Sequence, residues 1–327
     1  MNRYLTFLLA LSLAACASTD RDARPDWLDG SSEEFPARLY VIGIGSADEL
    51  STARDRARAD LAKTFRVSID ARSTDAEHYR TQQNGAGAET EYSAEIQRDL
   101  TVHTRQVLEG VTLPASWQDP ETRRYHALAV LNRAHAATRL REDIGGLDAA
   151  AETLMNRARA ADDAFTRAKL ALETVENQRQ RGALQDMLRA VDAGGRGVPP
   201  RWPLAELEAD LDVALSRIVL RAEGDDAWRT LLAGQLADSG FTVNGSGDYA
   251  VRLIVDDNAM KRDGWHWLRG TAALDVTGPD GRSLGQQRWN VKASATDAGT
   301  AETRFREQVA EVIAREGRDA ILGIVRE

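Results

Sequence analysis

The sequence predicts an α+β protein in which two small α/β sandwich-type domains are joined by a helical connector. Two stretches, 25–140 and 203–327, mix strand-like alternation with helical spacing of apolar residues. Between them, 141–195 shows helical spacing alone, and the breaker cluster GGRGVPPRWP at 194–203 marks the best domain boundary. At about 100–200 residues per domain, a chain of 327 residues also suggests two domains.

The chain begins with the features of a bacterial lipoprotein signal peptide over 1–15. Arg3 gives the N-terminal region a positive charge. The apolar run over 5–15 has the length of the apolar region of a secretory signal but is too short to span a membrane. The run ends in the four lipobox positions Leu13, Ala14, Ala15 and Cys16. The small residues let the signal peptidase approach the backbone, and the Cys16 thiol is the group that takes the lipid.

Cys16 is therefore expected to become the first residue of the mature protein and to carry acyl chains such as palmitate. It is the only cysteine in the chain, so no disulfide is predicted. Two or three acyl chains hold a protein firmly to a membrane, which makes 16–24 a lipidated tether. Residue 17 is Ala rather than the Asp that marks inner-membrane retention, which favours the cell outer membrane, on the side that faces the periplasm.

The composition excludes some classes of partner. The formal net charge is −9, and an acidic chain is a poor candidate for binding nucleic acid, or anionic lipid by charge. Beyond the signal peptide no segment approaches 18 consecutive apolar residues, so no transmembrane helix is predicted.

The first block, 25–140, opens as strand, helix and strand. Residues 39–47, LYVIGIGSA, form an apolar strand pattern, and the helical pattern that follows is rich in small residues. Residues 65–70, FRVSID, then alternate as in a strand with one buried face.

These residues carry a family resemblance. The order Pro25-Asp26-Trp27, LYVIGIGSA, small-residue helix and FRVSI resembles the LPP twenty-kilodalton outer-membrane lipoprotein family, over roughly 25–140. The resemblance implies a polar variable stretch at 75–90, a helix at 91–106 and a β-hairpin at 111–133. It also implies an outer-membrane location, and for some members an association with flagella or motility.

The pair Gly43-x-Gly45 after a strand invites comparison with a dinucleotide-binding turn. That fingerprint needs a third glycine, but position 48 is Asp and Glu49 follows, and two carboxylates there would repel a pyrophosphate. Ser46-x-x-Glu49 also fits a capping box, which uses the N–H groups that a phosphate would need. We therefore expect no nucleotide, and a tight strand-to-helix turn as the role of the glycines.

The connector, 141–195, predicts helices with one apolar side. Apolar or small residues recur three and four apart at 147, 151, 154, 158, 161, 165, 168, 172 and 175. The pair Asp162-Asp163 fits the start of a second helix, which would make a hairpin; one long rod is the alternative. A helical connector is favoured over a true coiled coil.

The last block, 203–327, reads as helix, strand, helix, strands and helix. The first three are expected at 203–217, 218–222 and 225–238, with Gly240 ending the second helix. Strands are expected over 249–256 and within 265–295, where a turn at 278–281 joins two of them, and a long helix over 300–325 ends the chain.

No motif for catalysis, metal or cofactor is present. The patterns H-E-x-x-H, G-x-S-x-G and CxxC are absent, and no two of the five histidines are three or four residues apart. The protein is therefore predicted not to be an enzyme.

One aromatic group is the remaining candidate site. Trp265 and Trp267 are two residues apart and share one face of a strand, and Trp289 lies on a partner strand. They form either ordinary sheet core or an exposed face for a protein partner or a glycan.

The sequence thus favours a non-enzymatic outer-membrane lipoprotein that is a structural or assembly partner in the cell envelope, with a flagellar connection as one form of it. The alternative is a periplasm-facing binding protein for a glycan, peptide or lipid. A deep pocket with converging polar groups would favour the binding protein, and a flat, apolar, rimmed surface would favour the assembly role.

Overall fold

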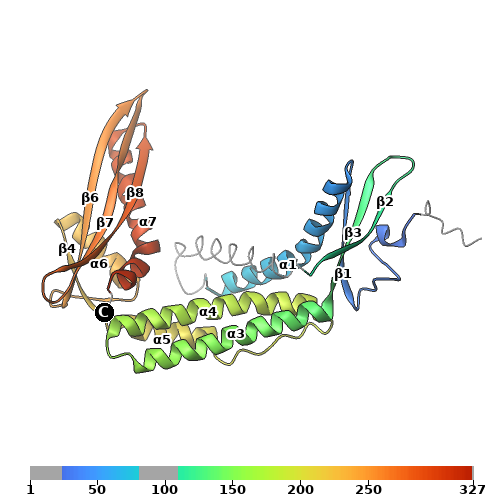
Figure 1. Ribbon diagram of the computed structural model, residues 1–327. Helices are drawn as coiled ribbons and strands as arrows, with labels where there is room; N and C mark the ends of the chain where they lie inside the picture. The colour runs from blue at the N-terminus through green and yellow to red at the C-terminus, as the bar shows by residue number, and fades with distance from the viewer. Residues whose placement is uncertain (1–23, 81–109, 326–327) are drawn as a thin grey trace, which may run out of the picture.

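The chain forms an α+β fold with two separate sheets. The structure, a computed structural model, describes residues 24–80 and 110–325. A three-stranded and a five-stranded sheet each pack against helices, and the two lobes stand at opposite ends of a pair of long helices (Figure 1). The predicted α+β class is confirmed. Within the described ranges, no helix combines the length and the apolar character that a membrane span requires.

The N-terminal lobe is an antiparallel sheet with a long helix on one face. Its elements are a 3-10 helix (Asp26–Asp29), β1 (Tyr40–Ala47), α1 (Leu50–Arg80), β2 (Thr112–Gln118) and β3 (Tyr125–Asn132). The strand order is β1-β3-β2, and both pairings are antiparallel. The hairpin expected over 111–133 is therefore present, whereas the helix expected over 91–106 lies outside the described residues.

Gly43 and Gly45 let α1 lie directly on β1. A Cβ atom at Gly45 would lie 2.1 Å from the carbonyl oxygen of Ala53, and one at Gly43 would lie 2.5 Å from that of Ala57. Both oxygens belong to the backbone of α1, so they cannot rotate away. The two glycines lie inside β1 rather than in the turn that the sequence suggested, and they serve close packing of helix on strand.

Gly45→Ala is expected to lower the free energy of unfolding by roughly 3 kcal/mol, the upper end of overpacking costs, because the new methyl group meets helix backbone. Gly146→Ala is the matched control: Gly146 is exposed within a helix and has open space around its Cβ position. The control should raise stability by about 0.5–1 kcal/mol. Chemical denaturation of both variants checks the prediction, and equal small effects would contradict the close packing.

Residues 65–70 are helical, not a strand. α1 continues through them to Arg80. Ala57, Leu61 and Phe65 are spaced by four residues and are all fully buried, so the helical stripe beneath the sheet outweighs the local strand propensity. The sheet neighbour of β1 is β3, which runs antiparallel. These residues therefore do not form the parallel βαβ unit of a dinucleotide-binding fold.

Side chains of α1 also cover the free edge of β1. The carboxylate of Asp60 accepts a hydrogen bond from the backbone N–H of Ile44 at 3.1 Å, and Arg56 donates to the carbonyl oxygen of Ser46 at 2.6 Å. These bonds satisfy backbone groups that would otherwise be open to another strand.

The connector is a helical hairpin. α3 (Arg133–Ala160) and α4 (Ala164–Val191) are separated by a short turn, and Asp163 caps α4 by accepting from the N–H of Thr166 at 2.7 Å. The hairpin predicted from Asp162-Asp163 is confirmed, and the single rod is wrong.

α4 contributes to the hydrophobic cores of both lobes. Its second half, with Leu184 and Leu188, packs in the cluster beneath β1 and β3. Its first half, with Phe165 and Leu172, packs in the cluster of the C-terminal lobe. The same helix therefore fixes both lobes.

The segment 192–203 runs back along α4. The N–H of Val198 donates to Gln185, and the carbonyl oxygen of Trp202 accepts from Gln178, so the segment is antiparallel to the helix. It contains the breaker cluster at 194–203 and ends at α5 (Leu204–Ser216).

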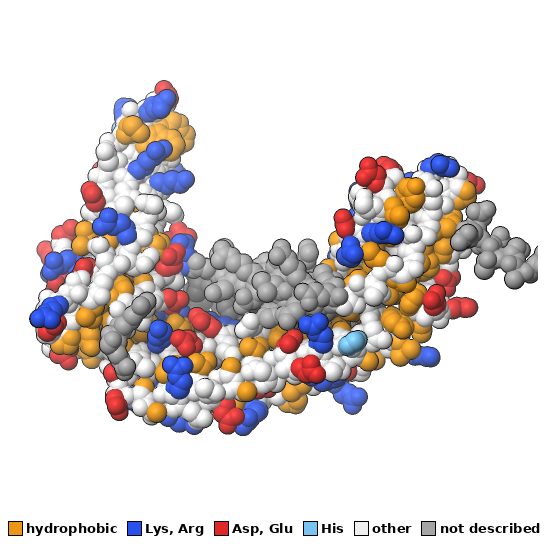
Figure 2. All heavy atoms as spheres, in the orientation of Figure 1, with side chains coloured by type: hydrophobic (Ala, Val, Ile, Leu, Met, Phe, Trp, Pro, Cys, Tyr) orange, Lys and Arg blue, Asp and Glu red, His pale blue; other side chains and the backbone are white. Residues whose placement is uncertain are grey.

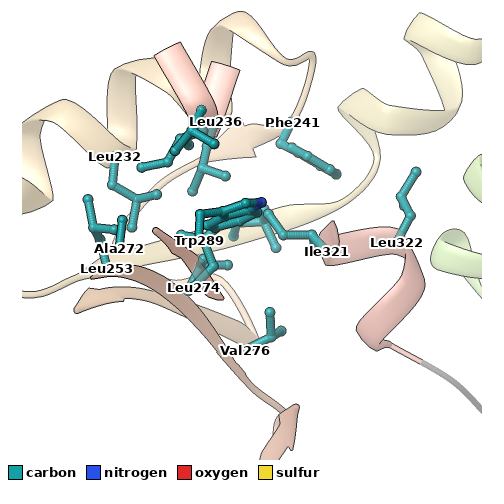
Figure 3. Packing of buried hydrophobic residues seen from close by; sticks show 14 of the residues in the cluster. Leu232, Leu236, Phe241, Leu253, Ala272, Leu274, Val276, Trp289, Ile321 and Leu322 are labelled. Carbon is teal, nitrogen blue, oxygen red and sulfur yellow. The ribbon is translucent and has the colours of Figure 1, made fainter. Parts of the chain in front are cut away.

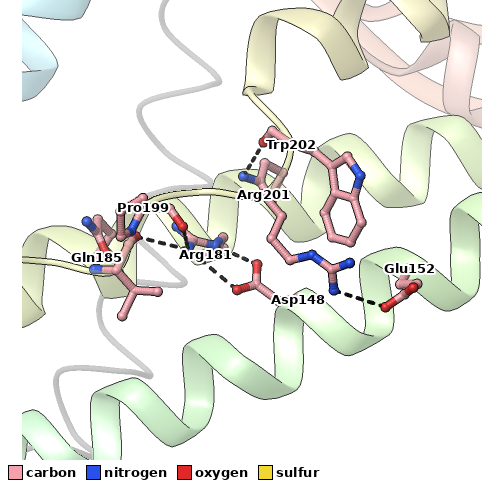
Figure 4. A network of polar contacts seen from close by, with 9 residues as sticks. Asp148, Glu152, Arg181, Gln185, Pro199, Arg201 and Trp202 are labelled. Carbon is pink, nitrogen blue, oxygen red and sulfur yellow. Dashed lines mark hydrogen bonds and ion pairs between the residues drawn. The ribbon is translucent and has the colours of Figure 1, made fainter.

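A buried arginine holds this segment to both helices (Figure 4). Arg181, on α4, has 2% of its surface exposed. Its Nε donates to Asp148 of α3 at 2.7 Å, and its Nη2 donates to the carbonyl oxygens of Val198 and Pro199, each at 3.1 Å.

The C-terminal lobe is a mixed five-stranded sheet, and its element order matches the order read from the sequence. Its elements are β4 (Val219–Glu223), α6 (Asp226–Asp238), β5 (Thr242–Val243), β6 (Tyr249–Arg262), β7 (Trp265–Thr277), β8 (Ser283–Ala295) and α7 (Ala298–Ile324). The strand order is β5-β4-β6-β7-β8; β4 is parallel to β5 and β6, and the last three strands are antiparallel. Gly278 and Gly281 close the expected turn between β7 and β8.

The core of this lobe lies between the sheet and its helices (Figure 3). Leu232 and Leu236 come from α6, Ile321 and Leu322 from α7, and Trp289 from β8 lies among them. One face of β6–β8 is thus covered, and the opposite face belongs to the candidate site.

Candidate functional site

Trp289 lies in the sheet core, so the core alternative holds for this residue and an exposed aromatic face does not include it. It pairs with Ala272 of β7 and is 8% exposed. Its indole N–H donates to Glu316 of α7. Ala272 is five residues from Trp267, an odd number, and strand alternation therefore places Trp289 on the sheet face opposite Trp267.

Trp265 and Trp267 do share the other face. Their ring centroids are 6.5 Å apart, and Trp265 is 43% exposed. Leu268, on the opposite face, is buried in the core. The predicted alternation is therefore confirmed for this pair.

We define the tip face as the outer side of the sheet at the far end of β6, β7 and β8. Cross-strand pairing sets its members in rows: Arg262 with Trp265; Met260 with Trp267 and Ser294; Asn258 with Arg269 and Lys292. Met260 is 47% exposed, and the Arg269 guanidinium lies 5.8 Å from the centre of the Trp267 ring. Figure 2 shows hydrophobic side chains bordered by Lys and Arg at the far end of this lobe.

The tip is positioned by a tight hairpin turn. Asp263 and Gly264 both have positive φ angles, 53° and 80°, as a two-residue type I′ turn requires. β6 therefore extends to Arg262 instead of ending near 256, and it carries Met260 and Arg262 to the side of the tryptophans.

A half-open depression lies beside the tip face. It has a volume of about 220 Å³, and its lining includes Met260 and Trp267 of the tip face together with Lys261, His266 and Glu302. Small-molecule sites usually enclose roughly 300–1,000 Å³. The depression therefore resembles surface relief more than a ligand pocket.

The N-terminal lobe contains a serine–histidine pair that the sequence did not predict. The Oγ of Ser46 lies 2.7 Å from Nδ1 of His126, across the β1–β3 pairing. Partial burial lowers the pKa of His126, which favours the neutral imidazole. Ser46 lies within β1, and its hydroxyl bonds with His126 and not with the first turn of α1. The capping box predicted from Ser46 is therefore wrong.

In the part of the chain that the structure describes, no carboxylate is hydrogen-bonded to His126 as the third group of a catalytic triad. The charge of Asp119 acts on His126, but the Asp119 carboxylate accepts from the Thr122 hydroxyl at 2.7 Å and from the N–H of Glu121 at 2.9 Å. Both bonds lower the pKa of Asp119 and stabilise its own turn. The 80-residue separation of Ser46 and His126 explains why no local motif revealed them.

The other predicted sites fall elsewhere. The lipobox residues Leu13, Ala14, Ala15 and Cys16 lie outside the described residues. Among the side chains that the structure describes, no group of three or more His, Cys, Asp or Glu is placed to hold a metal ion.

Comparisons with known proteins assign no family. No family model matches the chain, and no curated protein matches it. Among solved structures, the chain is similar to the crystal structure of the secreted protein HP1454 from the human pathogen Helicobacter pylori, at 15% identity and a TM-score of 0.40. That match covers 85% of this chain and 97% of the other.

Proposed function

We propose that this chain is a lipid-anchored, non-enzymatic protein of the bacterial outer membrane and a structural or assembly partner in the cell envelope. The lipobox ending at Cys16 supports the anchor and its location. The structural role is supported mainly by α4, which packs in the cores of both lobes.

A helix that packs in the cores of both lobes can hold the two lobes apart as a spacer. At about 1.5 Å per residue, 28 helical residues extend about 42 Å. The first described residues, from Arg24 onward, pack on the N-terminal lobe through Trp27, whereas the tip face belongs to the other lobe. A chain anchored near residue 16 would therefore carry the tip face on the lobe that is not joined directly to the anchor.

The binding-protein alternative has less support. The depression beside the tip face is smaller than usual ligand sites, and the tip face itself is an open surface of tryptophans and methionine. Neither of them encloses a small ligand. The connection to flagella or motility stays a prediction from the family resemblance.

Cys16→Ser in the full chain tests the anchor. The variant is expected to remain uncleaved by the lipoprotein signal peptidase and to disappear from the outer-membrane fraction, because serine has no thiol to acylate. Ala17→Ser is the control and should be processed normally. Fractionation and mass spectrometry of the N-terminus give the result; a Cys16→Ser protein that is processed and located normally would contradict the proposal.

Crosslinking tests the assembly role. A photo-reactive residue at the exposed Leu284 or Val213 would be activated in intact cells that carry the lipidated chain. The proposal expects an envelope protein in at least one adduct, identified by mass spectrometry. Adducts with cytoplasmic proteins alone would contradict it.

A further inference from the structure

We propose that the tip face docks on an anionic lipid surface, separately from the lipid on Cys16. The apolar part would enter the interface between lipid headgroups and acyl chains, and the basic part would contact the headgroups.

The apolar residues of the tip face are those that suit a membrane interface. Trp265 and Met260 are 43% and 47% exposed, and Trp267 lies beside them. Tryptophan is enriched at membrane interfaces because its ring is apolar and its N–H is polar. They lie next to the turn that joins β6 and β7, and Figure 1 shows these strands extending away from the connector helices.

The charge of the tip is opposite to that of the chain. Residues 258–269 contain three basic side chains and one acidic side chain, which gives 3 − 1 = +2, whereas the whole chain carries −9. The acidic side chain, Asp263, is 3.4 Å from Arg262. On the tip face itself Arg262, Arg269 and Lys292 are exposed, and none of its eight members is a carboxylate. The whole-chain charge argues against anionic lipid, but the local charge favours it.

The size of the face favours lipid over a protein partner. A standard protein interface uses about 20–30 residues on each side, which is far more than the tip face contains. The face does not continue along the sheet as a surface without acidic groups, because the next row of paired residues toward the body of the lobe contains Asp256. A membrane needs no shape complementarity and accepts a small face in which tryptophan and long basic side chains reach different depths.

Vesicle binding tests the inference with the chain from Ala17 onward, which keeps every described residue and lacks the lipidation site. It should co-sediment with vesicles that contain phosphatidylglycerol and not with pure phosphatidylcholine, and high salt should release it. Because the anchor is absent, failure here would leave the proposed anchor untouched.

Matched variants locate the contact. Trp265→Ser should weaken binding roughly tenfold, and Arg269→Gln about fivefold. The controls are Ile254→Ser and Arg288→Gln, which lie on the same sheet face outside the tip and should bind as the parent does. Unchanged thermal melts of the tip variants would show that folding is intact.

Two results would overturn the inference. One is the absence of binding to anionic vesicles, which would leave the tip face to a protein or a glycan. The other is equal binding by parent and Trp265→Ser, because the contact would then lie elsewhere.

Discussion

Trp289→Ala is expected to lower the free energy of unfolding by about 3–5 kcal/mol, as truncation of a large core aromatic does. The ring lies among side chains of α6 and α7, and the truncation would also leave Glu316 without the indole N–H (Figure 3). Trp265→Ala, on the exposed face of the same sheet, should change stability by no more than about 0.5 kcal/mol.

Thermal and chemical denaturation of the two variants beside the parent give the comparison. Trp289→Phe is a second variant that keeps most of the ring and loses the hydrogen bond, so it separates packing from the contact with Glu316. A small effect of Trp289→Ala, or a large effect of Trp265→Ala, would mean that the sheet faces are assigned the wrong way round.

The contrast shows where sequence reasoning reached its limit. Alternation within β7 correctly placed Trp265 and Trp267 together, because that needs only the period of a strand. Placing Trp289 requires the register between β7 and β8, which shifts between Val276 and Thr277 and so does not follow from the turn at 278–281 alone. The turn Asp263-Gly264, however, is a recognised hairpin signal and would have extended β6 to its observed end.

The helical connector was predicted well for a similar reason. The three-and-four spacing marked 165, 168, 172 and 175, and all four residues are buried along α4. Spacing says which side of a helix is buried, but not what covers it. That α4 serves two cores, and that 192–203 folds back along it, depends on tertiary contacts that no local pattern reveals.

The strand predicted at 65–70 failed because two patterns competed there. Three alternating residues suggested a strand, but Leu61 and Phe65 continue a buried helical stripe that begins at Ala53. A long stripe that packs beneath a sheet contributes more than the propensity of a short segment.

Arg181→Ala is the second large effect expected, at about 3–5 kcal/mol, because removing one partner of a buried ion pair leaves the other uncompensated. Asp148 would lose its cation, and the carbonyl oxygens of Val198 and Pro199 would lose their donor (Figure 4). Arg181→Lys should recover only part of the loss, since an ammonium group lacks the planar fork that reaches several acceptors.

Arg201 provides the matched control, because it also connects the segment 192–203 to α3. It pairs with Glu152 at 3.1 Å, but the two side chains are 58% and 51% exposed. An exposed pair contributes about 0–1 kcal/mol, so Arg201→Ala should have little effect.

A double variant separates the charge from the packing at Arg181. Arg181→Met alone should be strongly destabilising, because it keeps the volume but leaves the Asp148 carboxylate unpaired. Adding Asp148→Leu should restore part of the loss, since an apolar pair can replace a buried ion pair at little cost.

Denaturation gives the energies, and limited proteolysis gives the location: cleavage within 192–203 should appear in Arg181→Ala and not in Arg201→Ala. Equal protection in both variants would mean that the segment is held by its other contacts and that Arg181 is not what fixes it to the hairpin.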